Sequence, residues 1–115
     1  MAIGDSTFSW CDSLRSIELP EGLTTIGDEA FSGCDSLSSI KLPGSLTAIG
    51  YSAFSWCSSL SSVTIPASVT EIGENAFLSC NALILTVEQG SYAHEYAETH
   101  DIPYTYLEVP DWLMD

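Results

Sequence analysis

The stretch that decides the fold is IGDEAFSGCDSLSSIKLP at residues 26–43, because its pattern returns along the chain every 23 residues. Phenylalanine, isoleucine-glycine, cysteine and leucine all keep this spacing, and chance does not produce agreement in so many columns. The repeated positions are Phe8, Phe31, Phe54 and Phe77; Ile3, Ile26, Ile49 and Ile72; Cys11, Cys34, Cys57 and Cys80; and Leu14, Leu37, Leu60 and Leu83. A fixed period of this kind predicts a solenoid of stacked coils.

Each repeat contains a short segment in which apolar and polar residues alternate. In residues 37–42 this alternation predicts a strand with Ile40 and Leu42 facing inward and Ser39 and Lys41 facing outward. The segment also has the L-x-x-L-x-L spacing of leucine-rich repeats, and the period lies in their range. No single coil can bury its apolar side alone, so neighbouring coils stack into one continuous core.

The remainder of the repeat predicts a corner and a turn. Ile49-Gly50 marks the corner, where we expect Gly50 to take a positive φ. Residues 52–57, with Ala53 and Phe54 inward, predict a helical or 3₁₀ turn on the convex side. The predicted fold is therefore an α/β solenoid, a right-handed coil with a parallel sheet on its concave face.

The run at 26–43 resembles the BspA-like leucine-rich repeat family, which is built on 23-residue units. The resemblance covers residues 3–87, about three quarters of the chain, as about four coils. It implies a bacterial cell-surface or secreted parent protein that binds host or matrix proteins and mediates adhesion. The family brings no catalytic residues, so none are carried over to this chain.

The repeat changes character after residue 87. Serine becomes rare and tyrosine common, and Val87 falls one residue late against the inward column of the preceding strands. Ser91 is a good helix N-cap, and Tyr92 and Tyr96 begin an apolar helical stripe. Residues 88–107 are thus predicted to form a C-terminal cap of a helix and a closing strand, with 108–115 as an acidic tail or linker stub.

Composition excludes several classes of function. The 115 residues include 16 acidic side chains but only two basic ones, a formal net charge of −14. Nucleic-acid binding needs clustered basic side chains, so we expect no binding to nucleic acids. We also expect no insertion into a membrane, because no apolar run is long enough to span one. The start of the chain shows no signal peptide, so a surface or secreted location rests on the resemblance.

No reactive or metal-binding constellation stands out. The four cysteines form a straight column, which suits buried thiols better than disulfides or tetrahedral zinc, and we expect no cofactor. His94 and His100 do not share a helix face, so a packing role is favoured over a catalytic one. Asp5 and Asp28 stack as like charges; each is expected to cap its own turn, with a bridging calcium ion as the alternative.

Two surfaces are candidates for binding a partner. The concave sheet face should present hydroxyl and charged columns, with Glu18 beside Lys41 as an opposite-charge pair. Trp10 and Trp56 share a column on the convex side with Gly33 between them, and this notch suits an aromatic or proline side chain or a sugar ring. The predicted partner-binding residues are Ser16, Glu18, Ser39, Lys41, Ser62, Thr64, Trp10 and Trp56.

These features favour a non-catalytic module that binds a protein or glycoprotein surface. None of the common catalytic motifs for hydrolysis, phosphate binding or dinucleotide binding occurs, so we expect no enzyme activity. Two alternatives stay open. The apolar side of the first coil, beginning at Ile3, has no obvious cover and allows weak self-association into an assembly. The chain also suits an accessory domain of a larger secreted enzyme.

Overall fold

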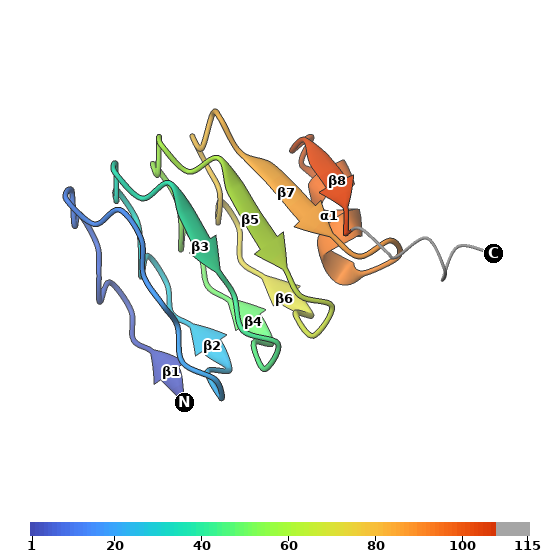
Figure 1. The fold of residues 1–115 in the computed structure, drawn as a ribbon, viewed down its shortest axis with the longest axis horizontal. Coiled ribbons are helices and arrows are strands. Elements are labelled where there is room, and N and C mark those ends of the chain that lie inside the picture. The colour runs from blue at the N-terminus through green and yellow to red at the C-terminus, as the bar shows by residue number, and fades with distance from the viewer. Residues whose placement is uncertain (108–115) are drawn as a thin grey trace.

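The chain folds as a stack of coils, shown by a computed structural model that describes residues 1–107 (Figure 1). Successive coils begin at Ile3, Ile26, Ile49 and Ile72, are called coils 1 to 4 below, and are followed by a closing turn. The predicted leucine-rich-repeat solenoid is confirmed. The predicted acidic tail at 108–115 lies outside the described residues. No helix among residues 1–107 is long and apolar enough to cross a membrane.

Two parallel sheets run along the stack, where the sequence predicted one. The first sheet has the order β1-β2-β4-β6 and consists of two-residue strands at the isoleucine corners. The second, called the broad sheet below, has the order β3-β5-β7-β8 and contains the longer strands. The strands are β1 Ala2–Ile3, β2 Thr25–Ile26, β3 Ser39–Lys41, β4 Ala48–Ile49, β5 Ser62–Ile65, β6 Glu71–Ile72, β7 Ile84–Val87 and β8 Tyr104–Tyr106.

Equivalent residues of successive coils stack directly on one another. The Phe8, Phe31, Phe54 and Phe77 rings form one column, with centroids 5.2, 5.2 and 5.4 Å apart and planes within 9° of parallel. Phe31 and Phe54, in the middle of the stack, are completely buried. The core is therefore a set of columns that runs the length of the solenoid, as the 23-residue period predicts.

The predicted helical turn over residues 52–57 is wrong. The segment consists of consecutive tight turns in which Ser52 and Trp56 take left-handed backbone conformations, with φ of 53° and 65°. The N–H groups of Ser52, Phe54 and Trp56 donate to carbonyls of coil 4, at 2.7–3.0 Å, instead of to their own segment. A helix would use these groups internally, so bonding between coils replaces it. Ala53 and Phe54 do point inward as expected.

The expected positive φ at Gly50 is also wrong, because Gly50 is not among the left-handed residues. Its role is close packing between coils. A Cβ atom added at Gly50 would lie 2.6 Å from the backbone N of Asp28 and 2.6 Å from the carbonyl carbon of Gly27. Such distances are far below van der Waals contact, so the corner excludes a side chain and lets neighbouring backbones touch.

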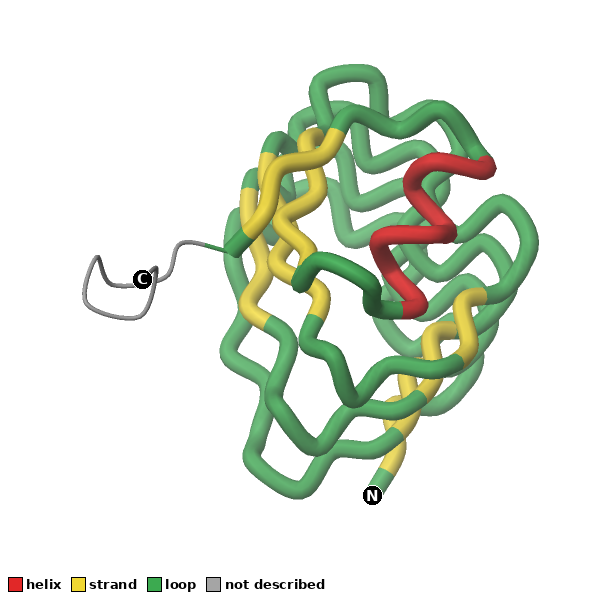
Figure 2. Tube along the Cα trace, turned by 90° about the vertical axis from the view of Figure 1, so that its right-hand side faces the viewer, coloured by secondary structure: helices red, strands yellow, loops and turns green. Residues whose placement is uncertain are grey.

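Helix α1 (Tyr92–Thr99) lies across the last coil (Figure 2). Ser91 is its N-cap, and the Ser91 hydroxyl accepts a hydrogen bond from the N–H of His94 at 3.2 Å. Tyr96 meets the end of the phenylalanine column edge-on, 6.4 Å from Phe77. Strand β8 then adds to β7 in parallel. The helix and strand expected here are present, although β8 is shorter than the predicted strand at 102–107.

The register of β7 differs from the predicted one. Val63 of β5 pairs with Leu85, 22 residues further on, and Ile65 pairs with Val87. The fourth coil is therefore one residue shorter. Leu85 occupies the inward position equivalent to Val63, and Val87 occupies the one equivalent to Ile65. The shift keeps both apolar side chains inside and turns Ile84 outward, where it is 47% exposed.

Tyr96 makes the stability of this end of the stack sensitive to alkaline pH. Burial raises the pKa of the Tyr96 hydroxyl to about 12. The unfolded chain then ionises near pH 10 while the folded chain does not, so this contribution is complete below pH 10 and is lost between pH 10 and 12. We expect the melting temperature to fall less from pH 8 to pH 11 in Tyr96→Phe than in wild type. Equal falls in the two proteins would contradict this assignment.

Candidate functional site

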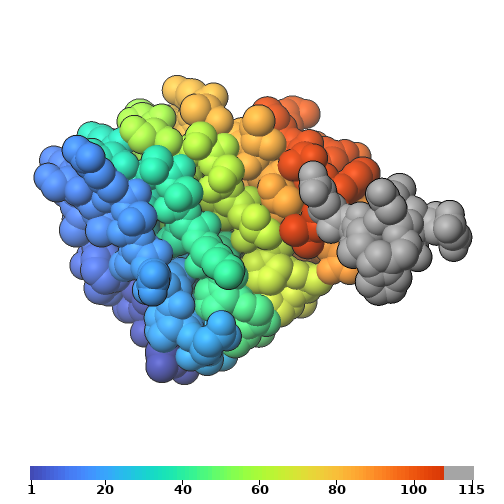
Figure 3. All heavy atoms as spheres, in the orientation of Figure 1, coloured from blue at the N-terminus to red at the C-terminus, as the bar shows by residue number. Residues whose placement is uncertain are grey.

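The exposed face of the broad sheet presents the polar columns that the sequence predicts. Ser39 pairs with Ser62 and Lys41 pairs with Thr64, and all four side chains are exposed. A single β-bridge extends the second column to Glu18 in coil 1, and Ser16 lies two residues before it. In the space-filling view the coils cross this face as successive bands (Figure 3). The repeat thus places small hydroxyl groups side by side on neighbouring strands.

Both basic side chains of the chain belong to these strand segments. Lys41 is the last residue of β3, and Arg15 precedes the corresponding segment of coil 1; both are exposed. The expected charge pair between Glu18 and Lys41 is not formed: their backbones pair, but no lysine or arginine side chain within residues 1–107 makes an ion pair with a carboxylate. The ammonium group of Lys41 therefore faces solvent without a carboxylate partner in the described part of the chain.

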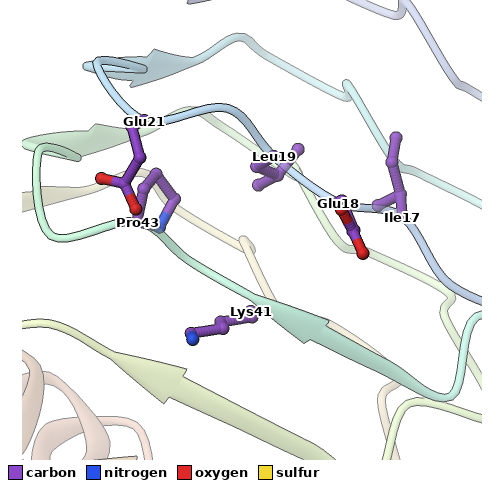
Figure 4. A pocket seen from close by; sticks show the side chains of 6 residues that line it. All are labelled: Ile17, Glu18, Leu19, Glu21, Lys41 and Pro43. Carbon is purple, nitrogen blue, oxygen red and sulfur yellow. The ribbon is translucent and has the colours of Figure 1, made fainter.

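A shallow pocket of about 330 Å³ opens beside Lys41 (Figure 4). Coil 1 contributes two half-buried apolar side chains and two carboxylates, and coil 2 contributes the lysine and a proline. The pocket combines an apolar surface with charges of both signs, which suits one side chain of a partner better than a small-molecule substrate. Its lining residues are Ile17, Glu18, Leu19, Glu21, Lys41 and Pro43.

The part of this face beyond coil 3 was not predicted from the sequence. The shifted register places the exposed Ile84 beside Ser62 and continues the Lys41–Thr64 column through Thr86 to Thr105 of β8. In an alternating segment either set of side chains can point inward. The pairing of Leu85 with the buried Val63 places Leu85 and Val87 inside, and Ile84 and Thr86 on the exposed face. The broad face therefore ends in an apolar residue and two threonines.

The two tryptophans are exposed as expected, but there is no open notch between them. Trp10 and Trp56 are 64% and 54% exposed. A Cβ atom added at Gly33 would overlap the six-membered ring of Trp10, so the indole lies on this glycine and fills the space above it. The open notch predicted over Gly33, between the two indoles, is therefore absent. What remains is an exposed aromatic surface in two of the coils.

The cysteine column has a structural role. All four cysteines are free, and three of them donate from sulfur to a phenylalanine carbonyl of the preceding coil; the distance from Cys34 Sγ to Phe8 O is 3.1 Å. Burial raises the pKa of the Cys34 thiol, and a hydrogen bond with Cys80 together with burial raises that of Cys57. Raised pKa values suppress the thiolate forms of Cys34 and Cys57, so these two side chains are poor nucleophiles, whereas the hydrogen bond with Cys57 lowers the pKa of Cys80.

The stacked aspartates were expected to cap their own turns. Each instead accepts a hydrogen bond from the backbone of the next coil. Asp5 Oδ1 accepts from the N–H of Asp28 at 2.9 Å, and Asp28 Oδ1 accepts from the N–H of Tyr51 at 2.9 Å. Each carboxylate therefore links two coils. Within residues 1–107, no three acidic, histidine or cysteine side chains are grouped as metal ligands.

The histidines pack within the C-terminal elements. His94 Nδ1 accepts from the N–H of Gly90 at 3.0 Å, and its ring lies 5.0 Å from that of Tyr104 and 5.2 Å from that of Tyr106. His100 stacks on Tyr96 at 4.1 Å. The His94 ring joins helix α1 to β8, whereas the exposed His100 ring packs on the end of its own helix.

Comparison with known proteins agrees with this architecture. A model of the BspA type leucine-rich repeat region matches residues 1–97 in six copies. The chain belongs to this family. A crystal structure of a leucine-rich repeat protein from Bacteroides ovatus superimposes with a TM-score of 0.81 and 32% identity over 93% of this chain. The leucine-rich repeat protein of T. pallidum gives a TM-score of 0.64 and 35% identity over 74%. No curated protein sequence matches.

The BspA-type family is typically protein-binding and not enzymatic. This chain spans 28% of the Bacteroides ovatus protein and 51% of the T. pallidum protein. The activity of a whole leucine-rich repeat protein therefore cannot be carried over to it. The broad face and the tryptophan surface are the features of this chain from which a function can be argued.

Proposed function

We propose that this chain is a non-catalytic binding module whose broad face contacts a protein or glycoprotein surface. The observation that carries the proposal is the chemistry of that face. On a chain with a net charge of −14, it holds hydroxyl columns and the ammonium group of Lys41, which has no carboxylate partner among residues 1–107. Low charge and many small hydrogen-bonding groups suit a polar macromolecular surface, and the pocket beside Lys41 can receive one anchoring side chain.

The family supports a role in adhesion by a bacterial cell-surface or secreted protein, in which this chain supplies contact area. The face has no exposed aromatic anchor in β3 or β5, so we expect modest affinity for each chain. Several coils or several copies would then act together, because linked weak contacts raise the overall strength of attachment.

The test uses immobilised collagen, laminin and fibronectin as probes. Ser62→Glu and Lys41→Glu place a carboxylate on the broad face, and we expect each to weaken binding about tenfold or more. Thr70→Glu is the matched control, because this substitution adds the same charge as Ser62→Glu. Thr70 is exposed and lies outside the broad sheet. Binding that all three variants retain, or the absence of binding to every probe, would contradict the proposal.

A second candidate function is self-association through coil 1. Its core-facing side chains are only half buried, whereas their equivalents in coils 2 and 3 are at most 5% exposed. A second copy placed against this coil would bury them, although the net charge opposes the approach at low salt. The half-buried residues are Ile3, Phe8, Cys11, Leu14, Ile17 and Leu19.

Light scattering at low and high salt separates this candidate from the first. Self-association through coil 1 predicts a mass that rises with protein concentration, more strongly at high salt because salt screens the repulsion. A monomer at all concentrations and both salt levels would remove it. An accessory role in a larger secreted enzyme is a further possibility only for a parent protein that carries a catalytic domain.

A further inference from the structure

Trp10 and Trp56 occupy backbone positions that suit glycine better than tryptophan. Their φ angles are 62° and 65°, and the equivalent position of coil 2 is Gly33 with a φ of 74°. Left-handed backbone is unfavourable for residues with a Cβ atom, by about 1–2 kcal/mol. Coil geometry therefore does not explain the two tryptophans, and their exposure means that little burial offsets the cost.

The ring of Trp10 lies as a platform on the surface. Three adjacent atoms of its six-membered ring, Cδ2, Cε3 and Cζ3, are the nearest neighbours of a Cβ atom placed on Gly33. One face of the indole therefore covers the glycine, and the other face is open to solvent. Trp56 has nearly the same φ and is likewise followed, one coil later, by a small residue, Ser79. The chain thus alternates large and small residues in this column.

The repeat sets the distance between the two tryptophans. Stacked phenylalanine rings of neighbouring coils are 5.2 Å apart, and Trp10 and Trp56 are separated by two coils, so their backbones lie about 10 Å apart. This distance is close to the length of two sugar units in an extended β-1,4-linked polysaccharide. Alternate sugar rings of such a chain can therefore meet the two indoles without bending.

Charge favours an uncharged ligand at this surface. Residues 42–70, which include Trp56, contain no acidic, basic or histidine residue. An anionic chain would meet the repulsion of the net charge of −14, and residues 42–70 around Trp56 supply no carboxylate to pair with a cationic chain. Two residues after the tryptophan column lie the exposed Asp12, Asp35 and Ser58, whose oxygen atoms can accept hydrogen bonds from sugar hydroxyl groups.

We propose that Trp10 and Trp56 form a two-platform binding site for a neutral, extended β-1,4-linked polysaccharide. The chain runs along the solenoid axis, and every second sugar presents the apolar face of its ring to an indole. Flat rings at a fixed spacing suit a regular polymer of flat units, and the site lies on the turns, away from the broad face. It is therefore independent of the function proposed above.

The test measures binding to cello-oligosaccharides and to soluble β-1,4-glucan, mannan and xylan. A hexasaccharide covers both platforms, whereas a disaccharide covers one. We therefore expect the hexasaccharide to bind at least about tenfold more tightly, which is the effect of stacking one additional base on an aromatic side chain in single-stranded nucleic-acid binding. Trp10→Ala and Trp56→Ala should each remove this advantage. Amylose, an α-1,4-linked glucan that coils, should bind no better than the disaccharide.

Tyr51→Ala is the matched control, because Tyr51 is an exposed aromatic residue of coil 3 outside the tryptophan column, and it should bind like wild type. Thermal melting of each variant shows that the fold is intact. The proposal is overturned if none of the three polysaccharides binds, if binding survives in the Trp10→Ala/Trp56→Ala double variant, or if a proline-rich peptide binds through the tryptophans while the polysaccharides do not.

Discussion

Phe54→Ala is expected to destabilise the protein by about 3–5 kcal/mol, the largest effect of any single substitution considered for this chain. Phe54 is fully buried and stacks on Phe31 at 5.2 Å and on Phe77 at 5.4 Å. Its removal leaves a cavity in the middle of the column and breaks two ring contacts at once. A loss of this size is a large part of the 5–15 kcal/mol typical of a domain.

Urea denaturation followed by circular dichroism measures the effect, with Phe8→Ala as the control at the end of the same column. Phe8 is half buried and has one stacked neighbour, so we expect a loss of about 1–2 kcal/mol. If Phe54→Ala is too unstable to purify, Phe54→Leu should still lose more than Phe8→Leu. Equal losses at the two positions would contradict a continuous column.

Gly50→Ala is expected to destabilise the protein by about 3 kcal/mol, although it adds only one methyl group. The new Cβ atom would lie 2.6 Å from backbone atoms of coil 2, and backbone cannot rotate aside as a flexible side chain can. The neighbouring coils must separate locally, which weakens the hydrogen bond from the N–H of Gly50 to the carbonyl of Ile26, now 2.8 Å long.

Gly44→Ala is the matched control for this substitution. No heavy atom lies within 4 Å of a Cβ atom placed on Gly44, and its φ is not left-handed. We therefore expect a change within about 0.5 kcal/mol or a slight stabilisation, because alanine restricts the unfolded chain. Thermal melting compares the two variants. A Gly50→Ala protein as stable as Gly44→Ala would show that the coils are not in close backbone contact at this corner.

The repeat made the core predictable residue by residue. Once residues align every 23 positions, a column that is apolar in one coil is apolar in the next, and stacking is the one arrangement that buries all copies. The same logic predicted the exposed pairs Ser39–Ser62 and Lys41–Thr64, since their positions follow from alternation within a strand.

The features that were mispredicted depend on contacts between coils, which a repeat pattern does not describe. The N–H of Phe54 bonds to the carbonyl of Ala76, so the turn is not helical. Glycine at position 50 was attributed to a positive φ, whereas it is required because the backbone of the preceding coil leaves no room for a Cβ atom. The position of the Trp10 ring on Gly33 depends on a side-chain rotamer. The inward position of Leu85 depends on a one-residue shortening of the fourth coil.

The most direct test of this account is a measurement of proton–proton contacts between individually assigned phenylalanine rings by NMR. Stacking of equivalent residues predicts contacts for the pairs 8–31, 31–54 and 54–77 and none for the pair 8–54, which is separated by an intervening ring. Both proposed binding surfaces depend on the same alignment. A contact between Phe8 and Phe54, or the absence of the 31–54 contact, would contradict it.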